Sequence, residues 1–510
     1  MADNQPVSVR PPHDEDVTYD HLLKYLGVFG GVQMFTLFMS LVRNKCTTSI
    51  LGAAGWGLSS MLMNISTFIS YTSNLGLPFS AVRNLSEIYE RGTAEEVAGY
   101  VGVVRTWSLW TAIFGAVLCL VCSPLISYYA FDKDMSRIPM ICGLAPMVVA
   151  LAVTSGEVSV MKALRRLKNL AVVNLLGGIS TLAFTVPLYA LYGTRGILAA
   201  LNLSALALMV INLYHSVRIV PWRVRLFSHD ILRDGASMVR LGIPFVLASI
   251  ANSAVGVIVP SFLLKMDSFA EVALYQWGYA LMITYAGMAF AVIDTDFFPR
   301  LSSVHADCGR MNVLINKQMN VCVLVIAPCL SLLVLLMPFV ILTLSTGQFL
   351  PVHGMAVCAA FYTFFKALSL PLAYIPLAKG DSVLFMCMEV AFALIVLPLV
   401  VVLYLTWGLT GTGVALSLAN LLELLILAFV YKWRYGFRFS SLPLRHAFVQ
   451  GLCLMAVVIM ALQPVEWLKY VAGLPVVAIS TMMSVRMLQH ESTFISDFLG
   501  RLKGRFSVKK

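Results

Sequence analysis

Long apolar runs separated by short polar segments constrain the fold of this chain more than any other feature. The 510-residue chain is 59% hydrophobic and only 12% charged, about half the charged share of a typical soluble protein. A helix needs about 20 mainly apolar residues to cross a bilayer, so we predict an all-α polytopic membrane protein with about 14 spans. The predicted spans are 22–42, 50–73, 99–128, 138–161, 170–192, 196–217, 241–264, 270–297, 319–345, 352–378, 382–406, 408–431, 446–464 and 468–485.

The Lys and Arg residues lie mostly in the connections between these runs, which predicts how the chain is oriented. A net charge of +11 could suggest nucleic acid, but no connection is long enough to fold a basic domain, so we expect no nucleic-acid partner. With the N-terminus inside, the inner segments hold 26 of the 36 Lys and Arg, the outer loops hold seven, and three lie within spans. The positive-inside rule therefore predicts cytoplasmic N- and C-termini.

Three short matches at nearly one spacing indicate that the chain repeats a six-span unit. Each pair lies 215 to 217 residues apart: Leu26-Gly27 with Leu241-Gly242, Arg83-Asn84-Leu85-Ser86 with Arg300-Leu301-Ser302, and Gly196-Ile197 with Gly413-Val414. We predict two six-helix bundles related by a pseudo-twofold axis along the membrane normal, with the substrate path between them and two additional C-terminal helices.

This organisation predicts the boundaries of six regions. They are a cytoplasmic N-tail (1–21), an N-terminal six-helix lobe (22–217), a cytoplasmic linker (218–240), a C-terminal six-helix lobe (241–431), two additional spans (446–485) and a basic cytoplasmic tail (486–510).

Polar side chains recur at helical spacing on two spans that the repeat makes equivalent. The second span carries Trp56, Ser60, Asn64, Thr67, Tyr71 and Asn74, and the eighth carries Gln276, Thr284 and Asp294. Such residues can hydrogen-bond neighbouring helices in lipid or line a shared wet cavity. On the second interpretation Trp56, Asn64 and Gln276 are candidate substrate-binding residues.

Charged residues within spans are costly in lipid and therefore informative. Lys366 lies in the tenth span, and Glu389 and Glu423 lie in the next two. One interpretation is a Lys–Glu pair that fixes helix register. The other is functional, with Lys366 binding an anionic substrate and Glu389, Glu423 and Asp294 binding a coupling ion.

Several cations lie near the predicted cytoplasmic ends of spans. The repeat places Arg83 and Arg300 symmetrically at a cytoplasmic mouth, where the planar guanidinium group would suit phosphate oxygens. Arg105 is expected to anchor its span at the interface. Glu157 is expected to be neutralised by the nearby cations Lys162, Arg165 and Arg166.

The chain carries no recognisable catalytic motif. It lacks a phosphate-binding Gly-rich loop with Lys, an HExxH motif and a GxSxG elbow, so we expect neither an enzyme nor a cofactor. The one CxxC spacing, Cys119 to Cys122, lies in a predicted span, so no metal site is expected.

The sequence resembles the Wzx-type polysaccharide flippases of the multidrug/oligosaccharidyl-lipid/polysaccharide exporter superfamily. The resemblance covers most of the first twelve spans. It rests on Gly31-Val32-Gln33, Val42-Arg43-Asn44-Lys45, Leu51-Gly52-Ala53-Ala54-Gly55-Trp56-Gly57, Leu75-Gly76-Leu77, Asp296-Phe297-Phe298-Pro299-Arg300-Leu301-Ser302, Ile315-Asn316-Lys317-Gln318, Pro328 and Phe349-Leu350-Pro351.

The resemblance implies alternating access and an undecaprenyl-diphosphate-linked oligosaccharide as substrate, flipped to the outer leaflet of a bacterial inner membrane. It also implies membrane lipids, polysaccharide polymerases and glycosyltransferases as partners, and cationic cavity residues at Arg83 and Arg300. An ion-coupled extruder of drugs or organic cations, or a lipid II flippase, is the alternative. A glycan polymerase would need a large outer loop, and the outer connections are short.

Overall fold

The computed structural model describes residues 19–224, 229–285, 287, 290, 297–298, 300–463 and 466–491, and these form helices and short connections without a β-strand. Nine segments are long and apolar enough to cross a membrane in the described part of the chain. Three of the nine contain more than one helix, and a fourth, α14 (Ser382–Tyr435), is broken at Gly408. The prediction of an all-α, polytopic, two-lobed membrane protein is confirmed.

The chain divides into two compact units. The first comprises 1–276 together with 344–348 and 389–393, and the second comprises 277–343, 349–388 and 394–510. The first unit contains α1 (Tyr19–Ser73), α2 (Leu77–Arg91), α3 (Ala94–Ala130), η1 (Met135–Arg137), α4 (Ile138–Cys142), α5 (Ala145–Ala163), α6 (Leu167–Tyr192), η2 (Gly193–Gly196), α7 (Ile197–Val217), α8 (His229–Met266) and most of α9 (Phe269–Tyr279).

The second unit holds η3 (Ala280–Thr284), α11 (Cys308–Leu335), most of α12 (Met337–Leu344) and most of η4 (Gly347–Val352). It also holds α13 (His353–Lys379), most of α14 (Ser382–Tyr435), α15 (Ser441–Ala461) and α16 (Glu466–Glu491). The predicted boundaries of the six regions stay a prediction.

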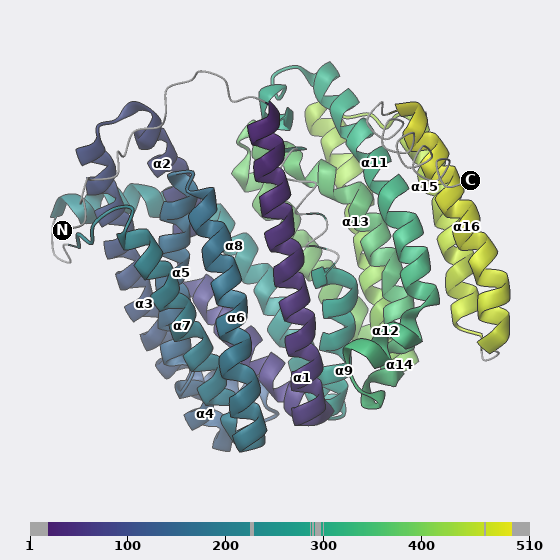
Figure 1. Ribbon diagram of the computed structural model, residues 1–510, viewed down its shortest axis with the longest axis horizontal. Coiled ribbons are helices and arrows are strands. Elements are labelled where there is room, and N and C mark those ends of the chain that lie inside the picture. Colours follow the sequence, from purple (N-terminus) through teal and green to yellow (C-terminus); the bar gives the residue numbers. More distant parts are fainter. Residues whose placement is uncertain are drawn as a thin grey trace, which may run out of the picture. The chain divides into compact units, whose positions relative to one another are not determined.

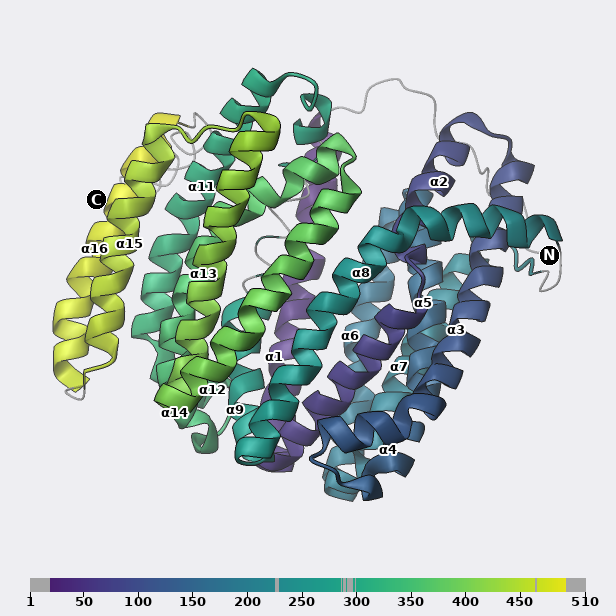
Figure 2. The same cartoon turned by 180° about the vertical axis from the view of Figure 1, so that it is seen from behind.

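Each unit is a bundle of helices that pack side by side. In the first unit α3 packs on α5, α6 on α7, and α1 on α6 (Figures 1 and 2). Its core includes Met61, Leu62 and Ile65 of α1, which are almost completely buried. In the second unit α11 packs against α13, α15 and α16. The two predicted C-terminal spans are therefore present as α15 and α16.

Helix starts and breaks follow local sequence signals. A capping box starts α3: Thr93 Oγ1 accepts a hydrogen bond from Glu96 N, and the Glu96 carboxylate accepts one from Thr93 N. Helix α1 is broken at Gly52 (φ 65°) and α14 at Gly408 (φ 59°), so each holds two predicted spans. Positive φ angles suit glycine, which has no Cβ.

The same backbone geometry recurs 215 residues apart, which supports the predicted repeat. Gly193 has φ 56° and ψ −135°, and Gly408 has φ 59° and ψ −145°. A Cβ on Gly196 would overlap the Leu188 carbonyl oxygen, and one on Gly411 would overlap that of Leu403. The structural counterpart of Gly196 is thus Gly411, whereas the sequence match chose Gly413.

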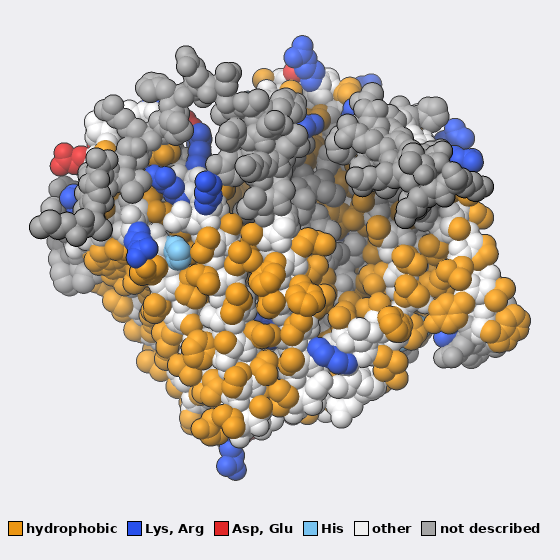
Figure 3. All heavy atoms as spheres, viewed as in Figure 1, with side chains coloured by type: hydrophobic (Ala, Val, Ile, Leu, Met, Phe, Trp, Pro, Cys, Tyr) orange, Lys and Arg blue, Asp and Glu red, His pale blue; other side chains and the backbone are white. Residues whose placement is uncertain are grey.

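Large apolar side chains are exposed along the helices, as a lipid-facing surface requires. Leu191 is 75% exposed and Phe429 is 76% exposed. Hydrophobic side chains cover much of the face shown in Figure 3, and most of the Lys and Arg side chains visible there lie in the upper part of the view. The protein is a multi-pass membrane protein.

Candidate substrate and coupling sites

The first unit contains a cavity of about 310 Å³ between both halves of α1 and helices α5, α6 and α7. Most of its polar lining residues carry hydroxyl groups, and neither Asp nor Glu lines it. The polar and aromatic lining consists of Arg43, Asn44, Thr47, Trp56, Ser59, Ser60, Thr181, Thr185, Tyr189 and Ser204. The cavity therefore offers hydroxyl groups, an aromatic ring and one cation.

The break in α1 at Gly52 allows residues on either side of it to reach this cavity. The sequence predicted an outer loop after residue 42, but α1 continues as helix to the break. The backbone N–H of Ala53, just past the break, donates to Gln348 Oε1 at 3.1 Å. Lys45 Nζ donates to the backbone oxygen of Ser345. The Ala53 N–H, which the break leaves outside the helix ladder, thus has a side-chain partner from a distant segment.

Arg43 is the site residue that sequence reasoning missed. The predicted spans place it in the first outer loop, and no site role was predicted for it. In the structure it lies in α1 and lines the cavity half-buried. Its side chain makes no hydrogen bond or ion pair with another residue in the described part of the chain. Arg carries five N–H donors in a planar fork, so Arg43 can donate to oxygen atoms of a bound molecule.

Most hydroxyl groups of the wall donate within their own helix. Thr181 Oγ1 donates to Gly177 O, Thr185 Oγ1 to Thr181 O, and Ser204 Oγ to Ala200 O, at 2.6 to 2.8 Å. A hydroxyl that donates its proton retains two lone pairs. The wall consequently accepts hydrogen bonds, and Arg43 donates them.

Some residues of the predicted polar stripe on the second span line a cavity, and another forms a hydrogen bond between helices. Trp56 and Ser60 line the cavity. Asn64 donates to the backbone oxygen of Gly256 on α8 at 2.8 Å, which is a helix–helix hydrogen bond. Gln276 is half-buried at the end of α9, and the role predicted for it stays a prediction.

The second unit contains the charged pair that the sequence allowed for. Lys366 Nζ of α13 lies 3.3 and 3.4 Å from the two carboxylate oxygens of Glu423 on α14. Asn420 Nδ2 also donates to Glu423 at 2.8 Å, while its own Oδ1 is buried without a described partner. The side chains of Lys366 and Glu423 are only 23% and 9% exposed, so the pair is largely shielded from solvent.

Glu389 has a different partner. Its Oε2 accepts a hydrogen bond from Asn252 Nδ2 of α8 at 2.6 Å. Glu389 carries no ion pair in the described part of the chain, so its carboxylate charge is not neutralised by a described cation. Asp294, the third predicted coupling residue, lies outside the described residues.

Arg83 and Arg300 are both exposed, on α2 of the first unit and in the second unit respectively. Their joint action on a diphosphate stays a prediction.

A buried ion pair in the first unit corrects two expectations. Arg105 does not anchor its span at the interface, because its side chain is 1% exposed and lies 3.0 Å from Glu157. Glu157 pairs with this Arg and not with Lys162, Arg165 or Arg166. Arg165 instead pairs with Glu90. No group of three His, Cys, Asp or Glu able to hold a metal is present in the described part of the chain.

Comparisons with known proteins agree with this architecture. The fold is that of lipid flippases and multidrug transporters. The structure of "Lipid II flippase MurJ, inward closed conformation" aligns with a TM-score of 0.68 and 14% identity, over 90% of this chain and 99% of that chain. An inward-facing MATE family multidrug transporter of the MOP superfamily aligns with a TM-score of 0.60 and 13% identity, over 81% and 98%. A MOP superfamily transporter from Pyrococcus furiosus, described as having a binding pocket of reverse polarity, aligns with a TM-score of 0.58 and 12% identity, over 83% of this chain and 99% of that chain.

Residues 48–353, more than half of the chain, match the family described as "Polysaccharide biosynthesis protein". The chain belongs to this family, and the resemblance noted in the sequence is confirmed. No curated protein matches the sequence.

Proposed function

We propose that this protein is a flippase that moves an undecaprenyl-diphosphate-linked oligosaccharide from the cytoplasmic to the outer leaflet of a bacterial inner membrane. The translocated glycan would supply O-antigen, capsule or exopolysaccharide assembly. The family match and the transporter fold support a polysaccharide-linked flippase or transporter. The cytoplasmic placement of both termini, the polymerase and glycosyltransferase partners and the identity of the lipid carrier belong to this proposal.

The observation that carries the proposal is the chemistry of the cavity in the first unit. A sugar presents hydroxyl groups and an apolar ring face. The cavity offers hydroxyl acceptors, the donors of Arg43 and the ring of Trp56. A ligand pocket of this kind places a few polar groups among apolar walls. Its volume of about 310 Å³ would admit part of an oligosaccharide at one time.

An extruder of organic cations fits the cavity less well. A bound cation needs a carboxylate or a cluster of aromatic rings, and this lining has one cation and no acid. In the second unit Glu423 is already paired with Lys366. Glu389 forms no ion pair with a described Lys or Arg. We assign it, together with Glu423 and Asp294, to binding of a coupling ion.

The test uses a strain that lacks the gene and carries plasmid copies of the wild type or of variants. Arg43→Gln should lower surface polysaccharide at least about tenfold, because a hydrogen bond between charged and polar groups contributes about 1.5–3 kcal/mol. Lipid-linked oligosaccharide should accumulate where an external lectin cannot reach it. Arg195→Gln is the matched control, since Arg195 is an exposed cation outside the cavity lining.

Normal polysaccharide with Arg43→Gln, at equal amounts of membrane protein, would remove Arg43 from the mechanism. The charge reversal of Arg83→Glu with Arg300→Glu tests the predicted diphosphate contacts in the same assay. If the deletion strain instead becomes drug-sensitive with intact polysaccharide, the extruder is correct. If the deletion blocks growth by trapping lipid II on the inner leaflet, the lipid II alternative is correct.

A further inference from the structure

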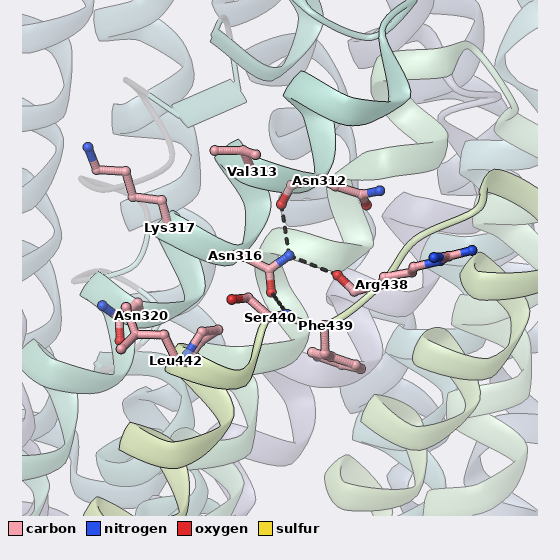
Figure 4. A pocket seen from close by; sticks show the side chains of 10 residues that line it. Asn312, Val313, Asn316, Lys317, Asn320, Arg438, Phe439, Ser440 and Leu442 are labelled. Carbon is pink, nitrogen blue, oxygen red and sulfur yellow. Dashed lines mark hydrogen bonds between the residues drawn. The ribbon is translucent and has the colours of Figure 1, made fainter.

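A groove of about 420 Å³ lies in the second unit, where the connection from α14 to α15 crosses the first turns of α11. Figure 4 shows its lining. The groove is lined by Asn312, Val313, Asn316, Lys317, Asn320, Arg438, Phe439, Ser440, Leu442 and Pro443. It is separate from the cavity of the first unit and has no part in the proposed flipping step.

Asn316 fixes the geometry of this groove. Its side chain is buried, and its Oδ1 accepts from Ser440 N at 2.7 Å. Its Nδ2 donates to Arg438 O at 2.9 Å and to Asn312 O at 2.8 Å, as the dashed lines in Figure 4 show. The bonds to Arg438 and Ser440 hold the connection against α11, and the bond to Asn312 orients the Asn316 side chain within its own helix.

The polar groups that remain available are positive. Lys317 and Arg438 are exposed and make no ion pair within the described residues, and no acid lines the groove. Figure 4 shows the two side chains on opposite sides of Asn316, with their charged ends directed away from it. Helix α15 starts here with no side-chain hydrogen bond at its N-cap, Ser440, which adds the positive end of a helix dipole.

Two apolar side chains of the lining, Val313 and Leu442, face outward. Val313 is 69% exposed and Leu442 is 46% exposed. Exposed apolar side chains continue along α15 at Leu444, Phe448, Leu452, Met455 and Ile459. The groove therefore lies where the cationic end of the unit meets its lipid-facing surface.

We propose that this groove binds one anionic phospholipid, with its phosphate headgroup over the start of α15, where the long, exposed side chains of Lys317 and Arg438 can turn towards it, and an acyl chain over Val313 and Leu442. The charge of the groove is complementary to such a headgroup, and basic pockets between transmembrane helices bind anionic lipids in this way. The Lys and Arg distribution predicts that the lipid comes from the cytoplasmic leaflet. The bound lipid would stabilise the contact of α15 with α11.

The test counts lipids on the purified full-length protein by native mass spectrometry during titration with phosphatidylglycerol or phosphatidylcholine. Each cation near an anionic lipid contributes about a fivefold preference. Lys317→Gln with Arg438→Gln should therefore weaken phosphatidylglycerol binding about 30-fold and leave phosphatidylcholine binding unchanged. Lys162→Gln with Lys168→Gln removes the same charge from exposed positions of the first unit and should have little effect.

Two further measurements keep the proposal falsifiable. Leu442→Ser leaves the charge intact and should weaken phosphatidylglycerol binding severalfold if an acyl chain lies there. Phosphatidylglycerol should raise the unfolding temperature of the wild type more than that of the double variant. Equal lipid binding by the double variant and its control would overturn the proposal, as would full competition by inorganic phosphate.

Discussion

The burial of the Arg105–Glu157 ion pair predicts a large loss of stability when either residue is replaced. Both side chains are almost completely buried, at 1% and 2% exposure. Arg105 Nε and Nη2 donate to the Glu157 carboxylate, and Nη2 also donates to Ser216 Oγ. Its Nη1 donates to Val220 O and Pro221 O at 3.0 and 2.9 Å. All five N–H donors of the guanidinium group therefore have acceptors.

Removing one charge leaves the other buried without compensation, which costs about 3–5 kcal/mol. We expect Glu157→Gln to lower the free energy of unfolding by that amount. Arg105→Met should lower the free energy of unfolding by at least as much, because the carbonyl oxygens of Val220 and Pro221 also lose their donor. Each buried group left unpaired costs about 1–3 kcal/mol. In Arg105→Met with Glu157→Gln the bare carboxylate is gone, so the double-mutant cycle of these two substitutions should give a coupling of about 2–3 kcal/mol.

The assay is equilibrium unfolding of the purified protein in detergent, followed by Trp fluorescence. The exposed pair of Arg91 and Glu87, at 3.6 Å with side chains 82% and 66% exposed, provides the control. Glu87→Gln should change the free energy of unfolding by less than about 1 kcal/mol. A loss with Glu157→Gln no larger than with Glu87→Gln would refute the argument that burial makes this pair indispensable.

Two other predictions concern the second unit. Gly408→Ala meets open space, but an alanine must then adopt φ 59° with ψ −145°, so we expect it to lower the free energy of unfolding by about 1–3 kcal/mol. Gly411→Ala would overlap the Leu403 carbonyl oxygen and should abolish folded protein, and the yield of monodisperse protein distinguishes the two variants. Lys366→Met should destabilise the unit by about 3 kcal/mol, and Glu423→Gln added to it should restore part of the loss, measured by the same unfolding assay. Equal stability of Lys366→Met and the wild type would contradict the account of this pair.

Hydropathy predicted the helices well because the thickness of the bilayer requires about 20 apolar residues in each span, independently of the helices that pack against it. The predicted spans 382–406 and 408–431 meet close to the observed break at Gly408. The extension of α1 past residue 42 was missed because Arg43 and Lys45 interrupt the apolar run. The helix nevertheless continues to the break at Gly52, and Gln348 of a distant segment accepts a hydrogen bond from the Ala53 N–H just past that break.

Polar contacts between distant segments could not be predicted from the sequence. Arg105 and Glu157 are 52 positions apart, and nearer cations gave Glu157 a plausible but wrong partner. The sequence likewise left two interpretations of Lys366, an ion pair with a Glu or a binding site for an anionic substrate. Deciding between them requires knowing which face of α14 packs against α13. Helical periodicity fixes the face of a residue on its own helix but not which face a neighbour presents.

The repeat gives the two units the same helices but different interiors. Leu151 and Leu208 line the cavity of the first unit. The residues 215 positions later, at the spacing of the Gly193 and Gly408 breaks, are Lys366 and Glu423, which form the ion pair. One scaffold thus holds a hydroxyl-lined cavity with a single Arg in one copy and a shielded charge pair in the other. A flippase needs both a place for its polar cargo and titratable or ion-binding groups that respond to a gradient. Under the proposed flippase function, substitutions at Arg43 should alter which glycan is carried, and substitutions at Glu423 should alter the dependence on the ion gradient.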